Sequence, residues 1–252
     1  MARHQDSRPA HHRIAASIRA DIMSGDLAPG EQLPITQQLI ERFGVSNQTV
    51  QRALQLLKAE GLIVGRSGRG VFVRETALRG FDSVGTMAPS GEGEPYSVLA
   101  QAAQQATRGM YRILDVREVV PPVQVREAFG LRANGTALLR YRLLLLDDDP
   151  AELVWSYYPM GIARGTALMD RRRIKGGSPT LLTGLGFPPR EMVDTVTWRA
   201  PTEEEFVTLE LPTGVPVSRT FRVVSSDDAR PIEATVIVQA GHLQHRLYRV
   251  TL

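Results

Sequence analysis

Short amide side chains are concentrated in one stretch near the N-terminus, which reads VSNQTVQRALQLL from residue 45. Asn47, Gln48 and Gln51 each carry a donor and an acceptor in a fork that matches adenine N6 and N7 in a major groove. Thr49 and Arg52 suit phosphate oxygens, contacts that position a protein on a duplex without reading its sequence. These side chains predict a surface that reads double-stranded DNA.

Arginine and glycine alternate in a second stretch, GRSGRG, which lies between two runs rich in β-branched residues. This pattern predicts a two-stranded hairpin over residues 62–73 with positive charge at its tip. Such a hairpin can enter a minor groove or lie along phosphate, although a glycine-rich tip alone is more often only a turn. The candidate contacts are Arg66, Gly68, Arg69 and Gly70.

Three helices must carry these side chains. Isoleucines at four-residue spacing predict an amphipathic helix over residues 12–24, which Gly25 ends. A short helix over residues 36–42 follows, and after a turn at Gly44 a third helix runs from residue 46 to 60. Two short helices joined by a tight glycine turn have helix-turn-helix geometry.

Arg140 and Arg142 form a second candidate site, in the C-terminal part of the chain. They are two residues apart on one predicted strand and share a face, where neighbouring guanidinium groups repel each other unless an anion or carboxylates lie between them. Leucines at 143–146 favour an otherwise apolar pocket. Alternatively, both arginines face solvent or pair with Glu152 and aspartates across the hairpin.

Composition limits the class of protein. With 252 residues and 42% hydrophobic residues, we expect one large or two modest globular domains. The net charge of +3 lies in residues 1–75, where 10 basic residues face 7 acidic ones, while the remaining residues balance at 20 and 20. This placement agrees with a polyanionic partner.

Several kinds of site find no support in the sequence. There are no cysteines, and His242 and His245 lack a third ligand, so we expect no metal site. Without a nucleophile elbow, an acid–base pair or a phosphate loop, we expect neither catalysis nor a cofactor. The polar start and the lack of a long apolar run predict a cytoplasmic protein with no membrane partner.

The domain boundaries follow from changes in local amino-acid composition. Residues 76–97 are rich in Gly, Ser and Pro and predict a linker between an N-terminal domain, 1–75, and a C-terminal domain, 98–252. In the C-terminal domain, Gly135 to Glu152 resembles Gly214 to Glu233, each reading as turn, strand, acidic turn and Pro-x-Glu strand. The repeat predicts a pseudo-symmetric antiparallel sheet with helices on one face.

The N-terminal residues resemble a known family. The anchors Leu33-Pro34, Phe43-Gly44-Val45-Ser46, Glu60-Gly61-Leu62-Ile63 and Gly68-Arg69-Gly70-Val71-Phe72-Val73 resemble the winged helix-turn-helix domain of GntR-family transcription regulators. The resemblance implies that Thr36, Gln37 and Ser46 also contact DNA. The family often has arginine where this chain has Asn47 and Gln51, which implies a different operator and a smaller phosphate share of the affinity.

Residues 98–252 resemble the UTRA effector-binding domain of the HutC subfamily of these regulators. This implies a chorismate-lyase-like α+β domain that dimerises and senses a small molecule through Arg140, Arg142, Ser178 and Glu233. Val154 and Ala240-Gly241-His242 depart from the family pattern. These departures argue against a sugar phosphate and leave open a more apolar ligand or none.

The sequence therefore predicts an α+β, sequence-specific transcriptional regulator. We expect a homodimer on a near-palindromic operator, acting as a repressor that a small-molecule effector of unknown identity releases. Two alternatives remain. One is an effector-independent plasmid or operon repressor, and the other is a small-molecule enzyme of chorismate-lyase-like fold, whose paired arginines would suit a carboxylate substrate.

Overall fold

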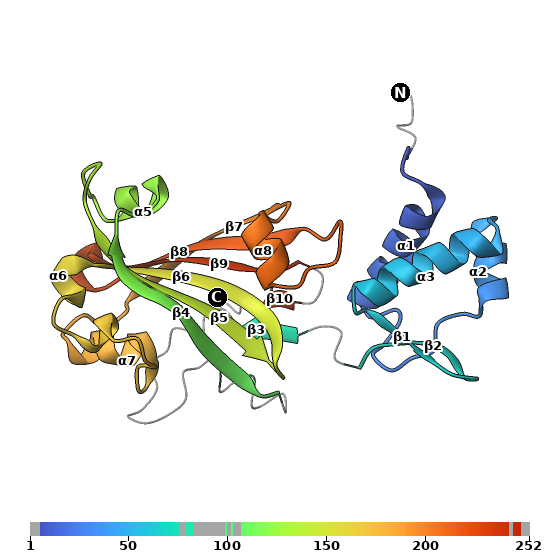
Figure 1. Cartoon of the computed structure of the whole chain (residues 1–252), viewed down its shortest axis with the longest axis horizontal. Coiled ribbons are helices and arrows are strands. Elements are labelled where there is room, and N and C mark those ends of the chain that lie inside the picture. The colour runs from blue at the N-terminus through green and yellow to red at the C-terminus, as the bar shows by residue number, and fades with distance from the viewer. Residues whose placement is uncertain are drawn as a thin grey trace. The chain divides into compact units, whose positions relative to one another are not determined.

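The computed structural model describes residues 6–75, 79–82, 99, 102, 107–241 and 244–247. The chain divides into two compact units, Met1–Arg79 and Gly80–Leu252 (Figure 1). Among the described residues, no helix has the length and apolar character that crossing a bilayer requires.

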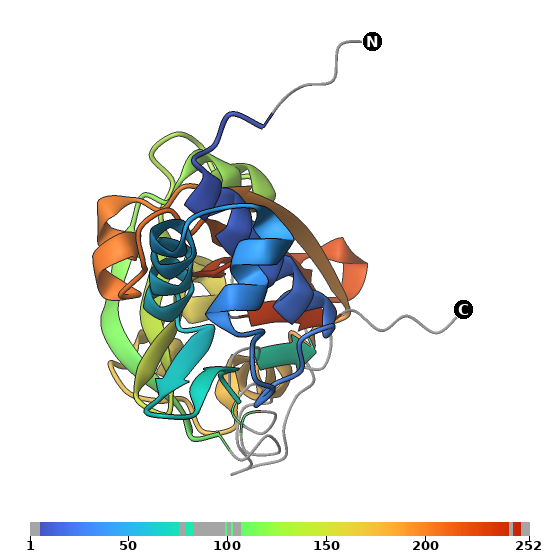
Figure 2. The same ribbon diagram turned by 90° about the vertical axis from the view of Figure 1, so that its right-hand side faces the viewer.

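The first unit is a three-helix domain with a wing (Figure 2). Its isoleucine stripe is buried on the first helix, and Gly25 ends that helix in the left-handed conformation with φ 86°. Gly44, with φ 61°, makes the predicted turn between the second and third helices. The elements are α1 (Ala10–Ser24), α2 (Thr36–Phe43), α3 (Asn47–Ala59), β1 (Ile63–Arg66) and β2 (Gly70–Val73).

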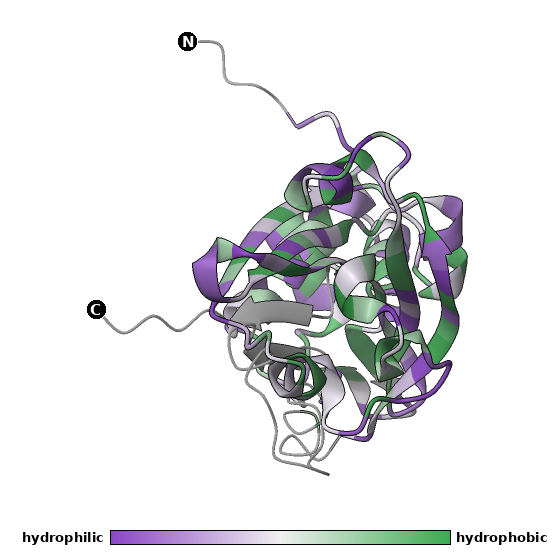
Figure 3. Ribbon diagram, turned by 90° about the vertical axis from the view of Figure 1, so that its left-hand side faces the viewer, coloured by the Kyte–Doolittle hydropathy of each residue, from purple (hydrophilic) through white to green (hydrophobic). Residues whose placement is uncertain are grey.

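The second unit is built on a six-stranded antiparallel sheet in the order β4-β5-β6-β9-β8-β7. Polar and apolar bands alternate along its ribbons (Figure 3), as expected where a strand turns successive side chains to opposite faces. The strands are β4 (Gly109–Val119), β5 (Ala137–Leu146), β6 (Asp149–Pro159), β7 (Glu191–Arg199), β8 (Val217–Ser225) and β9 (Pro231–Ala240).

Two halves of this sheet repeat each other. Strands β4, β5 and β6, with α5 (Val123–Ala128), correspond to β7, β8 and β9, with α8 (Glu203–Thr208). The β5–β6 turn holds Asp147 and Asp148 at positive φ, and the β8–β9 connection holds Asp228 and Ala229 there. The predicted pseudo-symmetry is therefore present in the strand order and in the turns.

Helices cover both faces of the sheet, so the prediction of one helical face is wrong. Val125 of α5 packs with Leu139 and Tyr157, whereas Leu182 of α7 (Gly177–Gly184) packs with Leu138 and neighbouring residues. Because Leu138 and Leu139 are adjacent on β5, they point to opposite faces. Figure 1 shows α5 and α7 on opposite sides of the sheet. The face that carries α7 also carries α6 (Met160–Ala163) and the 3-10 turn η2 (Ala167–Met169).

Residues 79–82, inside the segment expected to be a linker, form strand β3 (Arg79–Asp82). This strand pairs with β10 (Gln244–Leu247) in a separate two-stranded sheet. The linker prediction missed β3 because a strand of four residues has no periodicity to read.

Candidate DNA-binding and effector sites

The N-terminal half of α3 presents the predicted amides to solvent. Asn47, Gln48, Gln51 and Arg52 are exposed, while Val50 on the opposite side of the helix is fully buried. The amide of Gln51 lies 3.5 Å from Asn47 Oδ1 and 3.4 Å from Thr36 Oγ1. Contacts this long are weak and leave the amides available for hydrogen bonds with a base edge.

The beginning of α3 is fixed by its N-cap. Ser46 Oγ accepts a hydrogen bond from the backbone N–H of Thr49 at 3.3 Å, and the two hydroxyl groups lie 2.9 Å apart. An N-cap of this kind stabilises a helix by about 1 kcal/mol. Ser46 and Thr49 are therefore occupied in holding the helix start, and Gln37 of α2 donates to Glu41 at 2.9 Å.

The two arginines of the wing lie in different surroundings. Arg66 lies over the ring of Phe72, 4.6 Å from the centroid, and is 3.3 Å from the carboxylate of Glu75. Arg69 is exposed at the tip between Gly68 and Gly70. Arg69 is therefore better placed than Arg66 to reach a phosphate.

The segment that precedes α2 holds the wing in place. Gln32 bridges to Phe72 beyond the edge of β2, and its side-chain amide donates to the carbonyl of Arg69 at 3.0 Å. Gly70 has φ 108°, and a Cβ there would lie 2.6 Å from Gln32 Nε2. The Gln32 amide ends a flexible side chain and could move aside, so it is the positive φ of position 70, which L side chains rarely adopt, that favours glycine there.

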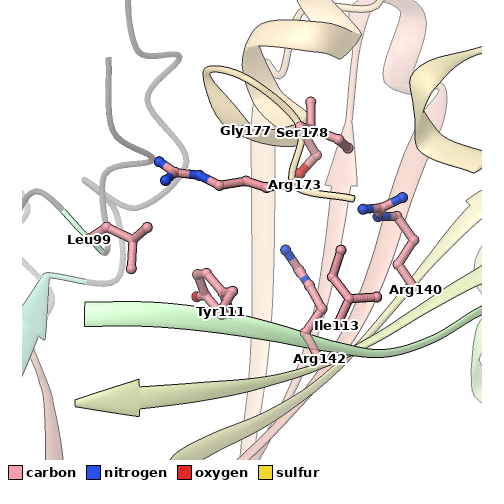
Figure 4. Close-up of a pocket in the computed structure, with 9 residues that line it drawn as sticks. Leu99, Tyr111, Ile113, Arg140, Arg142, Arg173, Gly177 and Ser178 are labelled. Carbon is pink, nitrogen blue, oxygen red and sulfur yellow. The ribbon is translucent and has the colours of Figure 1, made fainter. Parts of the chain in front are cut away.

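A pocket in the second unit brings together three of the four predicted effector residues, Arg140, Arg142 and Ser178. It lies between the β4–β5 edge of the sheet and the start of α7, and it holds about 470 Å³ of space counted out to its open mouth. Its other lining residues are mainly apolar, and Figure 4 shows most of them converging on one space. They are Leu99, Tyr111, Ile113, Arg173, Ile174 and Gly177.

Arg140 is buried and tied to the loop beside the pocket. Its guanidinium donates to the carbonyl of Leu168, to that of Asp170 at 2.7 Å and to that of Arg172 at 2.9 Å. Desolvation by burial lowers the pKa of Arg140, and the neighbouring Arg142 lowers it further. Three backbone carbonyls compensate this buried cation, so it neither faces solvent nor pairs with Glu152 as the alternative prediction had it.

Arg142 begins a chain of buried hydrogen bonds. It lies over the ring of Tyr111, 5.0 Å from the centroid, and donates to Ser156 Oγ at 2.8 Å. The hydroxyl groups of Ser156 and Thr235 are 3.0 Å apart, and Thr235 Oγ1 donates to Glu233 Oε1 at 2.7 Å. Thr235 has a single hydroxyl hydrogen, so it can donate to Ser156 or to Glu233 but not to both at once.

Glu233 closes this chain behind the pocket. It is buried, and its second carboxylate oxygen accepts a hydrogen bond from Ser178 Oγ at 3.5 Å. Glu233 is not among the pocket-lining residues, unlike Ser178. The two predicted residues are thus linked to each other, but only Ser178 reaches the cavity directly.

Arg173, in the basic run at residues 171–175, was not predicted as a site residue. It is exposed and lines the pocket, and it forms no ion pair with a described residue. The run could have suggested a site because it directly precedes the start of α7, where free backbone N–H groups favour anions. That helix begins at Gly177 after a left-handed Gly176, so Ser178 lies in its first turn.

Comparison with known proteins identifies both units. Residues 10–73 match the family model described as bacterial regulatory proteins, gntR family, and residues 105–242 match that of the UTRA domain. The chain belongs to the GntR family. It is therefore a DNA-binding transcriptional regulator with a winged helix-turn-helix domain and a UTRA effector-binding domain.

Individual relatives agree with this assignment. A helix-turn-helix regulator of Streptomyces coelicolor is 28% identical over 240 residues, covering 92% of this chain and 89% of its own. The transcriptional repressor NagR of Bacillus subtilis is 37% identical over 166 residues, 63% of this chain and 61% of its own.

Solved structures agree on the fold. A GntR-family regulator superposes with a TM-score of 0.61 at 24% identity, covering 97% of this chain and 98% of that one. PhnF of Mycobacterium smegmatis superposes with a TM-score of 0.58 at 18% identity, covering 94% and 99% of the two chains.

The described residues contain no cluster of three or more side chains suited to a metal ion. Of the two histidines considered at the outset, His242 lies outside the described residues, and His245 lies in β10.

Proposed function

We propose that this GntR-family regulator is a cytoplasmic, homodimeric repressor that leaves a near-palindromic operator when an anionic small molecule enters the UTRA pocket. The observation that carries the effector half of the proposal is the meeting of Arg142, Arg173 and the start of α7 on one largely apolar cavity. Two cations and the N-terminal end of a helix favour a negatively charged group.

The exposed stripe of Asn47, Gln48 and Gln51 supports sequence-specific reading of DNA. One small module rarely distinguishes its site from all others in a genome, whereas two modules on a two-fold symmetric operator multiply the discrimination. This favours a dimer. Repression is favoured by the name of the relative NagR, a transcriptional repressor.

The primary test is binding of the purified protein to the DNA upstream of its own gene, by mobility shift and footprinting across a salt series. We expect a protected near-palindrome and a steep loss of affinity with salt, because phosphate contacts release counterions. Weak binding without sequence preference to that DNA and to genomic fragments would refute the assignment of α3 as a recognition helix.

A second test concerns release. An effector can shift the DNA-binding equilibrium only by its difference in affinity between the two states, typically a factor of about 5–150. We expect a ligand of the pocket to weaken operator binding by a factor in this range. A ligand that binds the pocket and leaves operator affinity unchanged would contradict induction by release.

A further inference from the structure

The N-cap of α2 is an isoleucine that faces solvent. Ile35 has an extended backbone, with φ −62° and ψ 155°, and its side chain is 58% exposed. Serine, threonine, asparagine and aspartate are preferred at this position, because their oxygens accept a hydrogen bond from the first turn of the helix. Isoleucine makes no such bond. It therefore gives up a stabilising contact and exposes an apolar side chain at the same position.

The backbone holds the start of α2 without help from this side chain. The N–H of Ile35 donates to Gln38 Oε1 at 3.0 Å, and the carbonyl of Ile35 accepts from the N–H of Leu39 at 3.1 Å. Scattered exposed aliphatic residues are ordinary on a protein surface. Whether this one has a role is therefore decided by what surrounds it.

Ile35 lines a hollow between the start of α2, the helix α3 and the wing strand β2. The hollow holds about 410 Å³ of space counted out to its open mouth. Its walls are largely apolar, with Leu33, Pro34, Leu54 and Val71, and none of the described residues that line it carries a charge. Phosphate oxygens favour cations and hydrogen-bond donors. The hollow therefore suits an uncharged, apolar group.

The predicted DNA-reading residues border this hollow on two sides. Thr36 also lines the hollow, and its Oγ1 lies 3.4 Å from Nε2 of Gln51 on the exposed face of α3. On the other side, Gly70 lines the hollow next to Arg69 at the tip of the wing. A duplex in contact with both Gln51 and Arg69 therefore passes over Ile35.

Duplex DNA presents one methyl group in its major groove, the C5-methyl of thymine. An adenine that Gln51 reads is paired with a thymine, whose methyl group lies in the same groove. We propose that Ile35 reads this methyl group, so that the operator requires thymine at one position in each half-site. The DNA-reading surface then has an apolar component beside its amides, and α2 supplies it. This inference rests on the proposed function, because it adds a specificity residue to the same surface.

The test removes the methyl group and the side chain separately. The probes are synthetic duplexes of the footprinted operator, or of the tightest-binding sequence selected from a random pool. In each duplex, uracil replaces thymine at one position or at one symmetry-related pair of positions. Uracil lacks only the methyl group and still pairs with adenine. The proteins are the unchanged full-length chain, Ile35→Val and Ile35→Ser, and the dissociation constants are measured by mobility shift.

At one thymine in each half-site, we expect uracil to weaken binding by the unchanged protein. The expected loss is about fourfold for one half-site and about fifteenfold for both, since each missing methyl group removes one buried apolar contact. The salt dependence should stay the same, because an uncharged contact releases no counterion. Ile35→Val keeps branched methyl groups and should keep the preference for thymine. Ile35→Ser should bind the thymine and uracil duplexes equally.

Serine at position 35 also separates DNA reading from folding. Because serine is a preferred N-cap, Ile35→Ser should unfold at the same temperature as the unchanged protein or at a higher one, as followed by circular dichroism. Marked destabilisation would instead make Ile35 a residue that supports the fold.

Two results would overturn the role of Ile35 and leave operator recognition standing. One is that no thymine loses affinity on replacement by uracil, and the other is that the loss persists in Ile35→Ser. An equal loss in Ile35→Ser on thymine and uracil duplexes would also overturn it, since the hollow would then contact the sugar. If no duplex is bound with sequence preference, the proposed function fails, and the inference fails with it.

Discussion

Replacing Arg140 with methionine separates two roles that one arginine in an effector pocket could have. If Arg140 binds the ligand, its loss should weaken the effector and leave the ligand-free fold intact. The hydrogen bonds to the carbonyls of Leu168, Asp170 and Arg172 predict the reverse, that the variant is destabilised even without ligand.

The magnitude follows from those acceptors. The carbonyl of Leu168 is buried with Arg140, and an unsatisfied buried acceptor costs about 1–3 kcal/mol. The hydrogen bonds to Asp170 and Arg172 are only partly buried, so water can replace the guanidinium, and each contributes about 0.5–1 kcal/mol. Methionine keeps much of the packed volume, and relief from burying a charge offsets part of the loss. We expect the free energy of unfolding to fall by about 2–4 kcal/mol.

Urea denaturation followed by tryptophan fluorescence reports on the unfolding of the UTRA domain, because both tryptophans, Trp155 and Trp198, lie in that domain. Arg173→Met is the matched control. Arg173 is exposed and outside any ion pair with the described residues, so its replacement should change the stability by less than about 0.5 kcal/mol. Equal stability of the Arg140→Met and Arg173→Met proteins would refute the anchoring role of Arg140.

Outcomes are also expected for four further variants. Thr235→Val removes the donor to the buried Glu233 and should lower the free energy of unfolding by about 1–3 kcal/mol in the same urea assay. Unchanged stability of this variant would contradict the role of the buried hydrogen bonds. Burial acts to raise the pKa of Glu205, but hydrogen bonds from Arg199 and Thr202 outweigh it and lower that pKa below the ordinary 4.5. The stabilisation is therefore complete above the unfolded-state pKa and is lost as the pH falls through the lower folded-state value. Glu205→Gln should flatten the acid limb of the stability–pH curve, and an unchanged limb would contradict the assignment. Arg69→Ala should reduce the salt slope of operator binding by about 2 if a dimer loses two phosphate contacts, whereas Gln51→Ala should alter base preference at nearly constant slope.

The DNA-binding domain could be predicted almost entirely from the sequence. The isoleucine spacing in α1 and the glycine turn at Gly44 gave helix boundaries within two residues of those observed. In the second unit, the capping box at the start of α8 is a local signal of the same kind, with Glu205 accepting from the Thr202 N–H at 2.8 Å. Each of these signals depends only on residues within one or two turns of a helix, so it can be recognised from the sequence alone.

The proposed effector pocket could be predicted only in part. Arg140 and Arg142 were identified from their spacing on one strand. Their different roles depend on contacts with the loop at residues 168–173, which packs beside the pocket. That loop has neither periodicity nor a cap to fix its path. The contribution of Arg173, the indirect position of Glu233 and the covering of both sheet faces arise from such long-range packing.

The hydrogen bond from Gln32 to the wing has a consequence for the kinetics of DNA binding. The amide of Gln32 donates to the carbonyl of Arg69 and so restrains the tip in the free protein. In the proposed contact with DNA, the tip should therefore lose little conformational entropy on binding. Such a wing should associate rapidly and discriminate sharply by groove width, since it cannot reshape itself to fit an unsuitable site. In the Gln32→Ala variant, the tip would be less restrained. This variant should bind more operator variants than the unchanged protein does and dissociate from each of them faster.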